Sequence, residues 1–309
     1  MHRKTITLLG IQAGSGGRVK GAESGPHWLR KHGLAQRLIE HGHLVEDLGD
    51  IPGVYETRYS LGRGRAVNYL HNILQVNRHT HACVLGTRRK APGDFLLVIG
   101  GDHSLAIGTL AGLSDACERL GILWIDAHAD FNTPLSSPSG NIHGMSLAVA
   151  CGHGLPDLRS IASLDPMVRE EDVCLFGFRD VDPGEKAALQ RSRVQALSAA
   201  EWRRVGMAAA AQQAAASLAQ RCDHIHLSFD IDVLDSAIVP GTGTPVPDGL
   251  TRDEALAMLT AIGQSGHIRS AEFVEFNPRL DTGGQTGGLM LDLIAALLCP
   301  GGRATSAGG

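Results

Sequence analysis

Short apolar runs alternate with longer stretches of helical pattern along most of the chain. Several runs are apolar at consecutive positions rather than at every second one, which is typical of central parallel strands covered on both faces. Strands are predicted at residues 5–9, 44–46, 95–99, 121–125, 173–178, 195–197, 224–229 and 270–275. Helices are predicted at residues 27–41, 63–85, 104–120, 199–221, 252–263 and 288–298.

This alternation predicts an α/β protein with a mainly parallel sheet. No linker-like composition interrupts the pattern, so we expect residues 1–300 to form a single domain. The remaining residues, 301–309, are small and polar, and we expect a flexible tail there.

Composition excludes several classes of protein. With 309 residues, of which 43% are hydrophobic, the chain can bury a sizeable core. A net charge of -4 without a cluster of Lys and Arg argues against nucleic acid as a partner. No apolar run is long enough for a membrane span or a signal peptide, so we expect a cytoplasmic protein. The six cysteines show no CxxC spacing, which favours free thiols over disulfides or a zinc finger.

The most informative stretch is DAHAD, which directly follows the predicted strand at 121–125. It places Asp126, His128 and Asp130 at every second position. Alternate residues of an extended chain project to the same side. We therefore expect these three side chains to converge just beyond the end of a buried strand, as the ligands of a metal do.

Two other predicted strands also run into residues that can bind metals. The strand at 95–99 leads to His103, and the strand at 224–229 leads to Asp230 and Asp232. Open α/β sheets bind ligands beyond the carboxyl ends of their strands. Four carboxylates in one cleft repel each other unless cations neutralise them, and two divalent ions fit the count. An oxygen-rich donor set favours Mn²⁺. The six candidate ligands are His103, Asp126, His128, Asp130, Asp230 and Asp232.

Other polar residues near these strands have simpler explanations. A lone Asp or Ser after a strand is usually a turn former or a helix cap, and we interpret Asp102 and Ser104 in that way. His224 and His226 lie within a predicted strand. We treat both as structural, with His226 as a buried, hydrogen-bonded residue rather than a ligand.

Seven motifs in this order resemble the ureohydrolase, or arginase, family over nearly the whole chain. They are GGDHS at 100–104, DAHADFN at 126–132, SGNIHGM at 139–145, FRDVDPGE at 178–185, SFDID at 228–232, GTGTP at 241–245 and AEFVEFNP at 271–278. The resemblance implies a three-layer α/β/α fold around a central parallel sheet of about eight strands. It also implies two Mn²⁺ ions, one held by His103, Asp126, Asp130 and Asp230, the other by His128, Asp126, Asp230 and Asp232.

The loop at 132–141 resembles that of arginases, which recognise the α-carboxylate and α-amino group of L-arginine. By this resemblance Asn132, Ser137 and Ser139 bind the carboxylate, directly and through water, and neutral donors suit that task. Asp182 and Glu185 match the positions that receive the α-ammonium group. Thr244 matches a position that supports the metal cleft. The implied products are L-ornithine and urea.

The resemblance also implies a mechanism. A water that bridges two Mn²⁺ ions is acidified and attacks the guanidinium carbon. Asp130 would hydrogen-bond this nucleophile and later pass its proton to the departing amine. Glu275 would pair with the guanidinium group and orient it. His143, at the mouth of the cleft, would act as a proton shuttle.

Some positions depart from the family pattern. Ser236 stands where Pro is usual, and Phe276 stands where Val is common, with its side chain expected to face away from Glu275. The segment Thr251-Arg252-Asp253-Glu254 also differs at a subunit contact. The family resemblance still implies a homotrimer or homohexamer.

Three alternatives stay open. Agmatinase, or another ureohydrolase of guanidino compounds, would share the metal site and would differ in substrate. A deacetylase on a related fold normally uses a single zinc and would not need both His103 and Asp232. An inactive ureohydrolase-like binding protein would typically have lost ligands, whereas this chain keeps all six.

Overall fold

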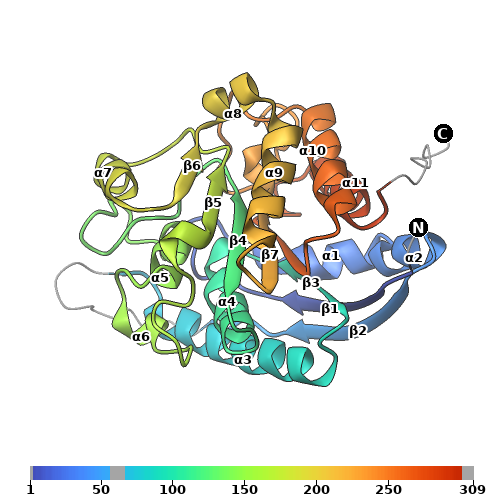
Figure 1. Ribbon diagram of the computed structural model, residues 1–309, viewed down its shortest axis with the longest axis horizontal. Helices are drawn as coiled ribbons and strands as arrows, with labels where there is room; N and C mark the ends of the chain where they lie inside the picture. The colour runs from blue at the N-terminus through green and yellow to red at the C-terminus, as the bar shows by residue number, and fades with distance from the viewer. Residues whose placement is uncertain (1–2, 56–66, 301–309) are drawn as a thin grey trace.

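Eight parallel strands form one sheet in the computed structural model, which describes residues 3–55 and 67–300. Their order across the sheet is β2-β1-β3-β8-β7-β4-β5-β6 (Figure 1). The strands are β1 Thr5–Ile11, β2 Leu44–Ile51, β3 Phe95–Gly100, β4 Leu120–Ile125, β5 Val173–Phe176, β6 Gln195–Leu197, β7 His224–Asp230 and β8 Ser270–Val274. The prediction of a parallel sheet of about eight strands is confirmed.

Helices cover both faces of the sheet, so the three-layer α/β/α prediction is also confirmed (Figure 1). One hydrophobic core packs the sheet against α1 Gly25–Lys31, α2 Leu34–Glu40, α8 Ala199–Val205, α9 Met207–Ala219, α10 Arg252–Ser265 and α11 Gln285–Leu298. The other core packs the opposite face against α3 Leu70–Lys90, α4 Ala106–Ser114, α5 Ser146–Ala150, α6 Pro156–Arg159 and α7 Pro183–Arg191. Central strands such as β3 and β4 are buried on both faces, which explains their unbroken apolar runs.

Two helices that were predicted as continuous are each broken at a glycine. The prediction at 27–41 is wrong because Gly33 has a φ of 85° and separates α1 from α2. Gly206, with a φ of 89°, likewise separates α8 from α9 within the stretch predicted at 199–221. Glycine adopts this left-handed region without the steric cost that other residues meet. The predicted helix start at residue 63 lies outside the described residues, and α3 begins at Leu70.

Several smaller elements were not predicted. Helices α5, α6 and α7 are short, between four and nine residues, so periodicity alone hardly marks them. Strand β2, at the edge of the sheet, extends to Ile51 through its pairing with β1. The sequence did not mark this extension because the later residues, including Asp47 and Gly49, have low strand propensity. The predicted strand at 173–178 ends earlier, at Phe176, because Gly177 follows with a φ of 97°.

The topology brings the chemically interesting segments to one place. Strands β3, β8, β7 and β4 are neighbours in the middle of the sheet, so the turns that follow their carboxyl ends lie together. All six cysteines are free and four of them are buried, as expected. None of the described helices is both long and apolar enough to cross a membrane.

Candidate functional site

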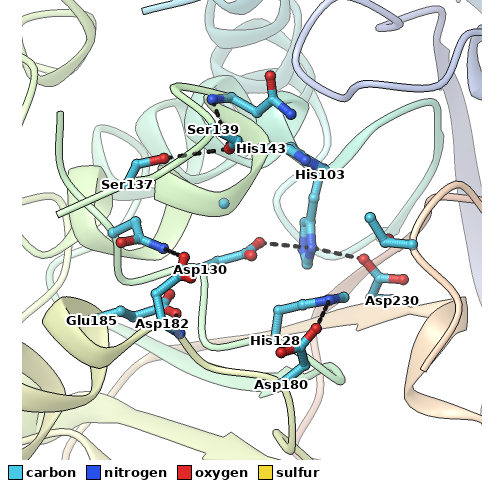
Figure 2. A pocket seen from close by; sticks show the side chains of 14 residues that line it. His103, His128, Asp130, Ser137, Ser139, His143, Asp180, Asp182, Glu185 and Asp230 are labelled. Atoms are coloured by element: carbon cyan, nitrogen blue, oxygen red, sulfur yellow. Dashed lines mark hydrogen bonds and ion pairs between the residues drawn. The ribbon is translucent and has the colours of Figure 1, made fainter. Parts of the chain in front are cut away.

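The six predicted ligands meet beyond the carboxyl ends of β3, β4 and β7. Their donor atoms form two groups of closely spaced side chains, and both groups include Asp126. The first group is His103, Asp126 and Asp230, and the second is Asp126, His128 and Asp232. Figure 2 shows the imidazole of His103 between the carboxylates of Asp130 and Asp230.

The first group surrounds one nitrogen of His103 with three carboxylates. Nδ1 lies 3.1 Å from Asp126 Oδ2, 3.1 Å from Asp130 Oδ2 and 3.2 Å from Asp230 Oδ2. All four residues are buried. His103 Nδ1 and Asp130 Oδ2 have no hydrogen-bond partner among the described residues. Orphaned polar atoms at this depth are costly, and a cation between them would satisfy both.

The second group adjoins the first through Asp126. His128 Nδ1 lies 3.4 Å from Asp126 Oδ1 and 3.1 Å from Asp232 Oδ2. Asp126 thus presents Oδ2 to one group and Oδ1 to the other, which is the geometry of a bridging ligand. Asp230 Oδ1 accepts a hydrogen bond of 2.9 Å from the backbone N–H of Asp232, and Asp230 presents its other oxygen to the first group.

The electrostatics of this cluster favour bound cations. Burial and the neighbouring carboxylates of Asp232 and Asp126 raise the pKa of Asp230 well above its ordinary value. Burial also raises the pKa of Asp130 to about 6, with Asp126 adding to the effect. Each shift reflects a carboxylate that lacks enough positive charge nearby. Two divalent ions would balance the four carboxylates of the cluster, and oxygen donors with two imidazoles suit Mn²⁺. The residues present therefore fit the expected metal centre.

Two of the predicted catalytic residues have a left-handed backbone. Asp130 has a φ of 49° and Glu275 has a φ of 63°. For residues other than glycine this conformation costs about 1–3 kcal/mol and tends to persist where function requires it. Glu275 follows the last residue of β8, and the unusual φ bends the chain there so that its carboxylate faces His103 and His143.

A cavity of about 140 Å³ opens over the cluster of candidate metal ligands. Its wall includes all of the predicted substrate-binding residues and His143: Asn132, Ser137, Ser139, His143, Asp182, Glu185 and Thr244. Figure 2 shows the hydroxyls of Ser137 and Ser139 on one part of the wall and the carboxylates of Asp182 and Glu185 on another. The structure thus brings the predicted set together, while the roles of its members stay predictions.

Hydrogen bonds hold the wall residues in place. Asn132 donates from Nδ2 to Asp182 Oδ2 over 2.9 Å, and its Oδ1 accepts from the Ser136 hydroxyl over 2.8 Å. The hydroxyls of Ser137 and Ser139 are 3.4 Å apart. Thr244 donates to Asp232 Oδ2 over 2.8 Å, so it contacts a predicted metal ligand directly.

Glu185 is the most deeply buried acid in the cavity wall outside the metal cluster. Its Oε1 accepts a bond of 2.7 Å from the backbone N–H of Phe131, and its Oε2 accepts one of 3.2 Å from that of Asp182. Asp182 caps the N-terminus of α7, and Glu185 is the third residue of that helix. Burial raises the pKa of Glu185 to about 8, although the backbone bond from Phe131 opposes the shift.

Three further residues at the cavity were not predicted. Asn141 and Asp180 line the wall, and Asp180 Oδ2 lies 3.9 Å from His128 Nε2. Both belong to motifs that were recognised, so their position beside assigned residues was an available signal. Asn68 donates from Nδ2 to Asn141 Oδ1 over 2.7 Å and to the Ser139 carbonyl over 3.2 Å. Nothing in the local sequence around Asn68 marks this long-range contact.

The chain matches a family model described as "Arginase family" over residues 4–299. It is 40% identical to an arginase of Bacillus caldovelox over 295 residues, which cover 95% of this chain and 98% of that protein.

Two solved structures are also similar to the chain. A crystal structure of arginase from Bacillus subtilis has a TM-score of 0.88 and 38% identity, covering 97% of this chain and 99% of the other. An Entamoeba histolytica arginase in complex with L-ornithine has a TM-score of 0.86 and 33% identity, covering 96% and 99%. Because the family model matches nearly the whole length of the chain, the chain belongs to the arginase family.

Proposed function

We propose that the protein hydrolyses L-arginine to L-ornithine and urea, with two Mn²⁺ ions as cofactors. The observation that carries this proposal is the pair of ligand groups joined through Asp126, beneath a cavity whose wall combines amide and hydroxyl groups with the carboxylates of Asp182 and Glu185. The similarity to bacterial arginases and to an arginase that binds L-ornithine supports the same reaction.

Two histidines and four aspartates are the proposed metal ligands. One ion would be held by His103, Asp126, Asp130 and Asp230, and the other by His128, Asp126, Asp230 and Asp232. When bound, the two ions supply a water acidified enough to act as a nucleophile near neutral pH. The protein's own residues would then position the substrate and move protons.

Glu275 is proposed to orient the guanidinium group. Its Oε1 accepts hydrogen bonds from the backbone N–H of His103 and from His143 Nδ1. These bonds fix the carboxylate beside the cluster, and the described contacts do not use Oε2. A guanidinium group pairs well with a carboxylate fixed in this way. Correct placement of the guanidinium carbon lowers the activation barrier of hydrolysis, because the bound substrate then loses less orientational entropy on reaching the transition state.

Asp130 and His143 are proposed to handle protons. Both lie in the cavity wall, where Asp130 can accept a proton from the attacking water and pass it to the leaving nitrogen. The carboxylate of Glu275, together with Asp130 and Asp102, overcomes the effect of burial and raises the pKa of His143 to about 9. His143 is therefore mostly protonated near neutral pH and is suited to carry protons between the cavity and the solvent, as the proposed shuttle.

The far end of the cavity is proposed to recognise the amino-acid part of arginine. Asn132, Ser137 and Ser139 offer neutral donors to the α-carboxylate, while Asp182 and Glu185 offer oxygens to the α-ammonium group. Agmatine lacks the carboxylate, so these donors would lose their partner. A site built to hydrogen-bond a polar group discriminates strongly against an analogue that lacks it.

A substrate panel tests the proposal. The purified protein loaded with Mn²⁺ should release urea from L-arginine and far less from agmatine or guanidinobutyrate. Metal analysis should find two ions per subunit. Absence of urea from arginine in a protein that holds two ions would refute the arginase reaction, and preference for agmatine would reassign the substrate.

Assembly and location belong to the same proposal. We propose a single catalytic domain over residues 1–300, assembled as a homotrimer or homohexamer in the cytoplasm. The family resemblance supports this assembly, and light scattering of the purified protein measures it. A monomer at assay concentration would refute it.

A further inference from the structure

A row of buried polar side chains lies on one face of the two central strands β7 and β8. His224, His226 and Ser228 alternate along β7 with apolar residues that face the opposite core. Across the ladder, His226 pairs with Ser270 and Ser228 pairs with Glu272. The row occupies the sheet face that α3 and α4 cover, where the adjacent strands present apolar side chains. Such a polar row in a hydrophobic core is costly unless its members form hydrogen bonds or ion pairs with one another.

One end of the row contacts a proposed metal ligand. His103 Nε2 lies 2.8 Å from Ser228 Oγ, and Ser228 donates its hydroxyl proton to Glu272 Oε1 over 2.7 Å. Because the serine proton is used in this way, Ser228 Oγ must accept from His103. His103 Nε2 therefore donates to Ser228, which leaves Nδ1 as the nitrogen that a cation among the three carboxylates would contact. This is the tautomer that a metal requires.

The other end of the row supplies a partner for the buried charge of Glu272. His226 Nε2 lies 3.5 Å from Glu272 Oε1, and its Nδ1 lies 2.8 Å from Ser270 Oγ. Ser270 Oγ is also 2.8 Å from His224 Nε2. Ser270 has one proton, so it can donate to one histidine and accept from the other. Burial lowers the pKa of His224 to about 3, so this ring is neutral, and its Nε2 can either accept from Ser270 or donate to it.

The contacts of Glu272 differ from those of Asp172, a buried carboxylate in the described part of the chain that two arginines contact. Asp172 is fully buried, but two arginines, Arg119 and Arg221, contact it at the protein surface. Glu272 has no arginine or lysine among its described contacts, and a single hydroxyl separates it from His103. Burial disfavours its charged form, yet attraction to His226 and the bond from Ser228 lower the pKa of Glu272.

We propose that Glu272 is a positioning residue for the metal centre. Acting through Ser228, it fixes the tautomer and orientation of His103, and its negative charge strengthens the imidazole as a ligand. His226, whose Nε2 lies 3.5 Å from Glu272 Oε1, borders this carboxylate within the core. This inference rests on the proposed metal centre, because its effect is on the ion that His103 holds. Mutation of residues that hydrogen-bond to the non-ligating nitrogen of a metal-binding histidine typically lowers metal affinity by about 10–100-fold.

Calorimetric titration of the metal-free protein with Mn²⁺ tests the proposal. In Glu272→Gln, which keeps the size of the side chain and removes its charge, one of two binding steps should weaken by about tenfold or more. It should be the step that His103→Asn abolishes, and the other step should not change. Asp172→Asn is the matched control, because it removes an equally buried charge remote from the metal ligands, and its metal affinities should equal those of the wild type.

A double-mutant cycle separates this relay from a general electrostatic effect. Ser228→Ala breaks the path while leaving Glu272 charged, so it should weaken the same step, and Glu272→Gln should then have little further effect. Additive effects would overturn the relay. Wild-type affinity in folded Glu272→Gln would overturn the proposal outright. If that variant does not fold, wild-type affinity in Ser228→Ala would overturn it instead. A protein that binds both ions normally but makes no urea would refute the proposed function alone.

Discussion

Glu275 Oε1 accepts a hydrogen bond of 2.9 Å from Nδ1 of His143. The same oxygen accepts a bond of 2.8 Å from the backbone N–H of His103, so one atom connects the mouth of the cavity to the metal cluster. Each histidine is the first residue of a short 3-10 helix, His103–Leu105 or His143–Met145. Glu275 directly follows β8. A change at Glu275 should therefore affect proton handling as well as substrate orientation.

The protonation of His143 should depend on Glu275. Although burial opposes it, this carboxylate is the largest cause of the raised pKa of about 9. In Glu275→Gln the pKa of His143 should fall by at least one unit, on the order of the 1.4 kcal/mol that one unit represents. NMR titration of the histidine ring protons measures it directly. An unchanged His143 pKa would contradict the pairing seen in the structure.

The same contact should appear in the pH dependence of stability. A group whose folded pKa is raised stabilises the fold fully below its unfolded value, here about 6.5, and this contribution is lost as pH rises through about 9. The difference in unfolding free energy between the metal-free wild type and His143→Asn should shrink across that window. Chemical denaturation at a series of pH values measures it. A difference that grows with pH would show the sign to be wrong.

Glu185 should give a pH dependence in which the charged form destabilises the fold. Its folded pKa of about 8 lies above the ordinary 4.5, so the folded protein binds its proton more tightly than the unfolded chain. Stability therefore falls as pH rises from about 4.5 through about 8. Glu185→Gln removes that titration. The free energy of unfolding of the variant, relative to that of the wild type, should therefore increase by a few kcal/mol as pH rises through this range. Chemical denaturation of both proteins at a series of pH values measures this difference. If the difference in unfolding free energy stayed constant up to alkaline pH, Glu185 would not be a buried acid with a raised pKa.

Asn68 should matter for arginine more than for agmatine. Its side chain holds Ser139 and Asn141, and its backbone N–H donates to the Gly140 carbonyl over 3.0 Å. Asn68→Ala loses the two side-chain bonds and loosens the proposed carboxylate loop. The KM for arginine should rise by about tenfold, which corresponds to about 1.4 kcal/mol, with kcat nearly unchanged.

Agmatine is the internal control for this variant, because it has no carboxylate for the loop to bind. Its low kcat/KM should stay as in the wild type, so the preference for arginine should narrow. If both substrates lose activity equally, Asn68 supports the fold of the site rather than the recognition of the carboxylate.

The convergence of the proposed metal ligands could be predicted from the sequence because it depends on local geometry. Asp126, His128 and Asp130 follow one strand at alternate positions, and the carboxyl ends of parallel strands share one edge of the sheet. Phe276 was also expected to face away from Glu275 and does so, although β8 ends at Val274 and the left-handed backbone of Glu275 interrupts the strand alternation on which that prediction rested. Phe276 is buried in the opposite core, with its ring 5.2 Å from that of Trp28.

Other features could not be predicted in this way because they depend on distant partners. Asn68 and Asn141 are 73 positions apart and meet only in the folded chain, where the segment before α3 lies against the loop at 132–141. His226 was correctly expected to be a buried, hydrogen-bonded residue, but its link to Glu272 requires β7 and β8 to be neighbours. Sequence patterns indicate that strands exist and do not give their order across the sheet.

Removal of metal should reveal Asp126 as the ligand shared by both ions. It presents Oδ2 to His103 and Oδ1 to His128, so Asp126→Asn should reduce binding at both groups, whereas His128→Asn should leave one ion per subunit. Chelation of the wild type should lower Tm, because the buried carboxylates would then repel one another, and added Mn²⁺ should restore it in a concentration-dependent way. Metal analysis and thermal denaturation measure these effects. If Asp126→Asn lost one ion and kept the other at wild-type affinity, the prediction would be wrong. Asp126 would then contact one ion only and would not be a bridging ligand.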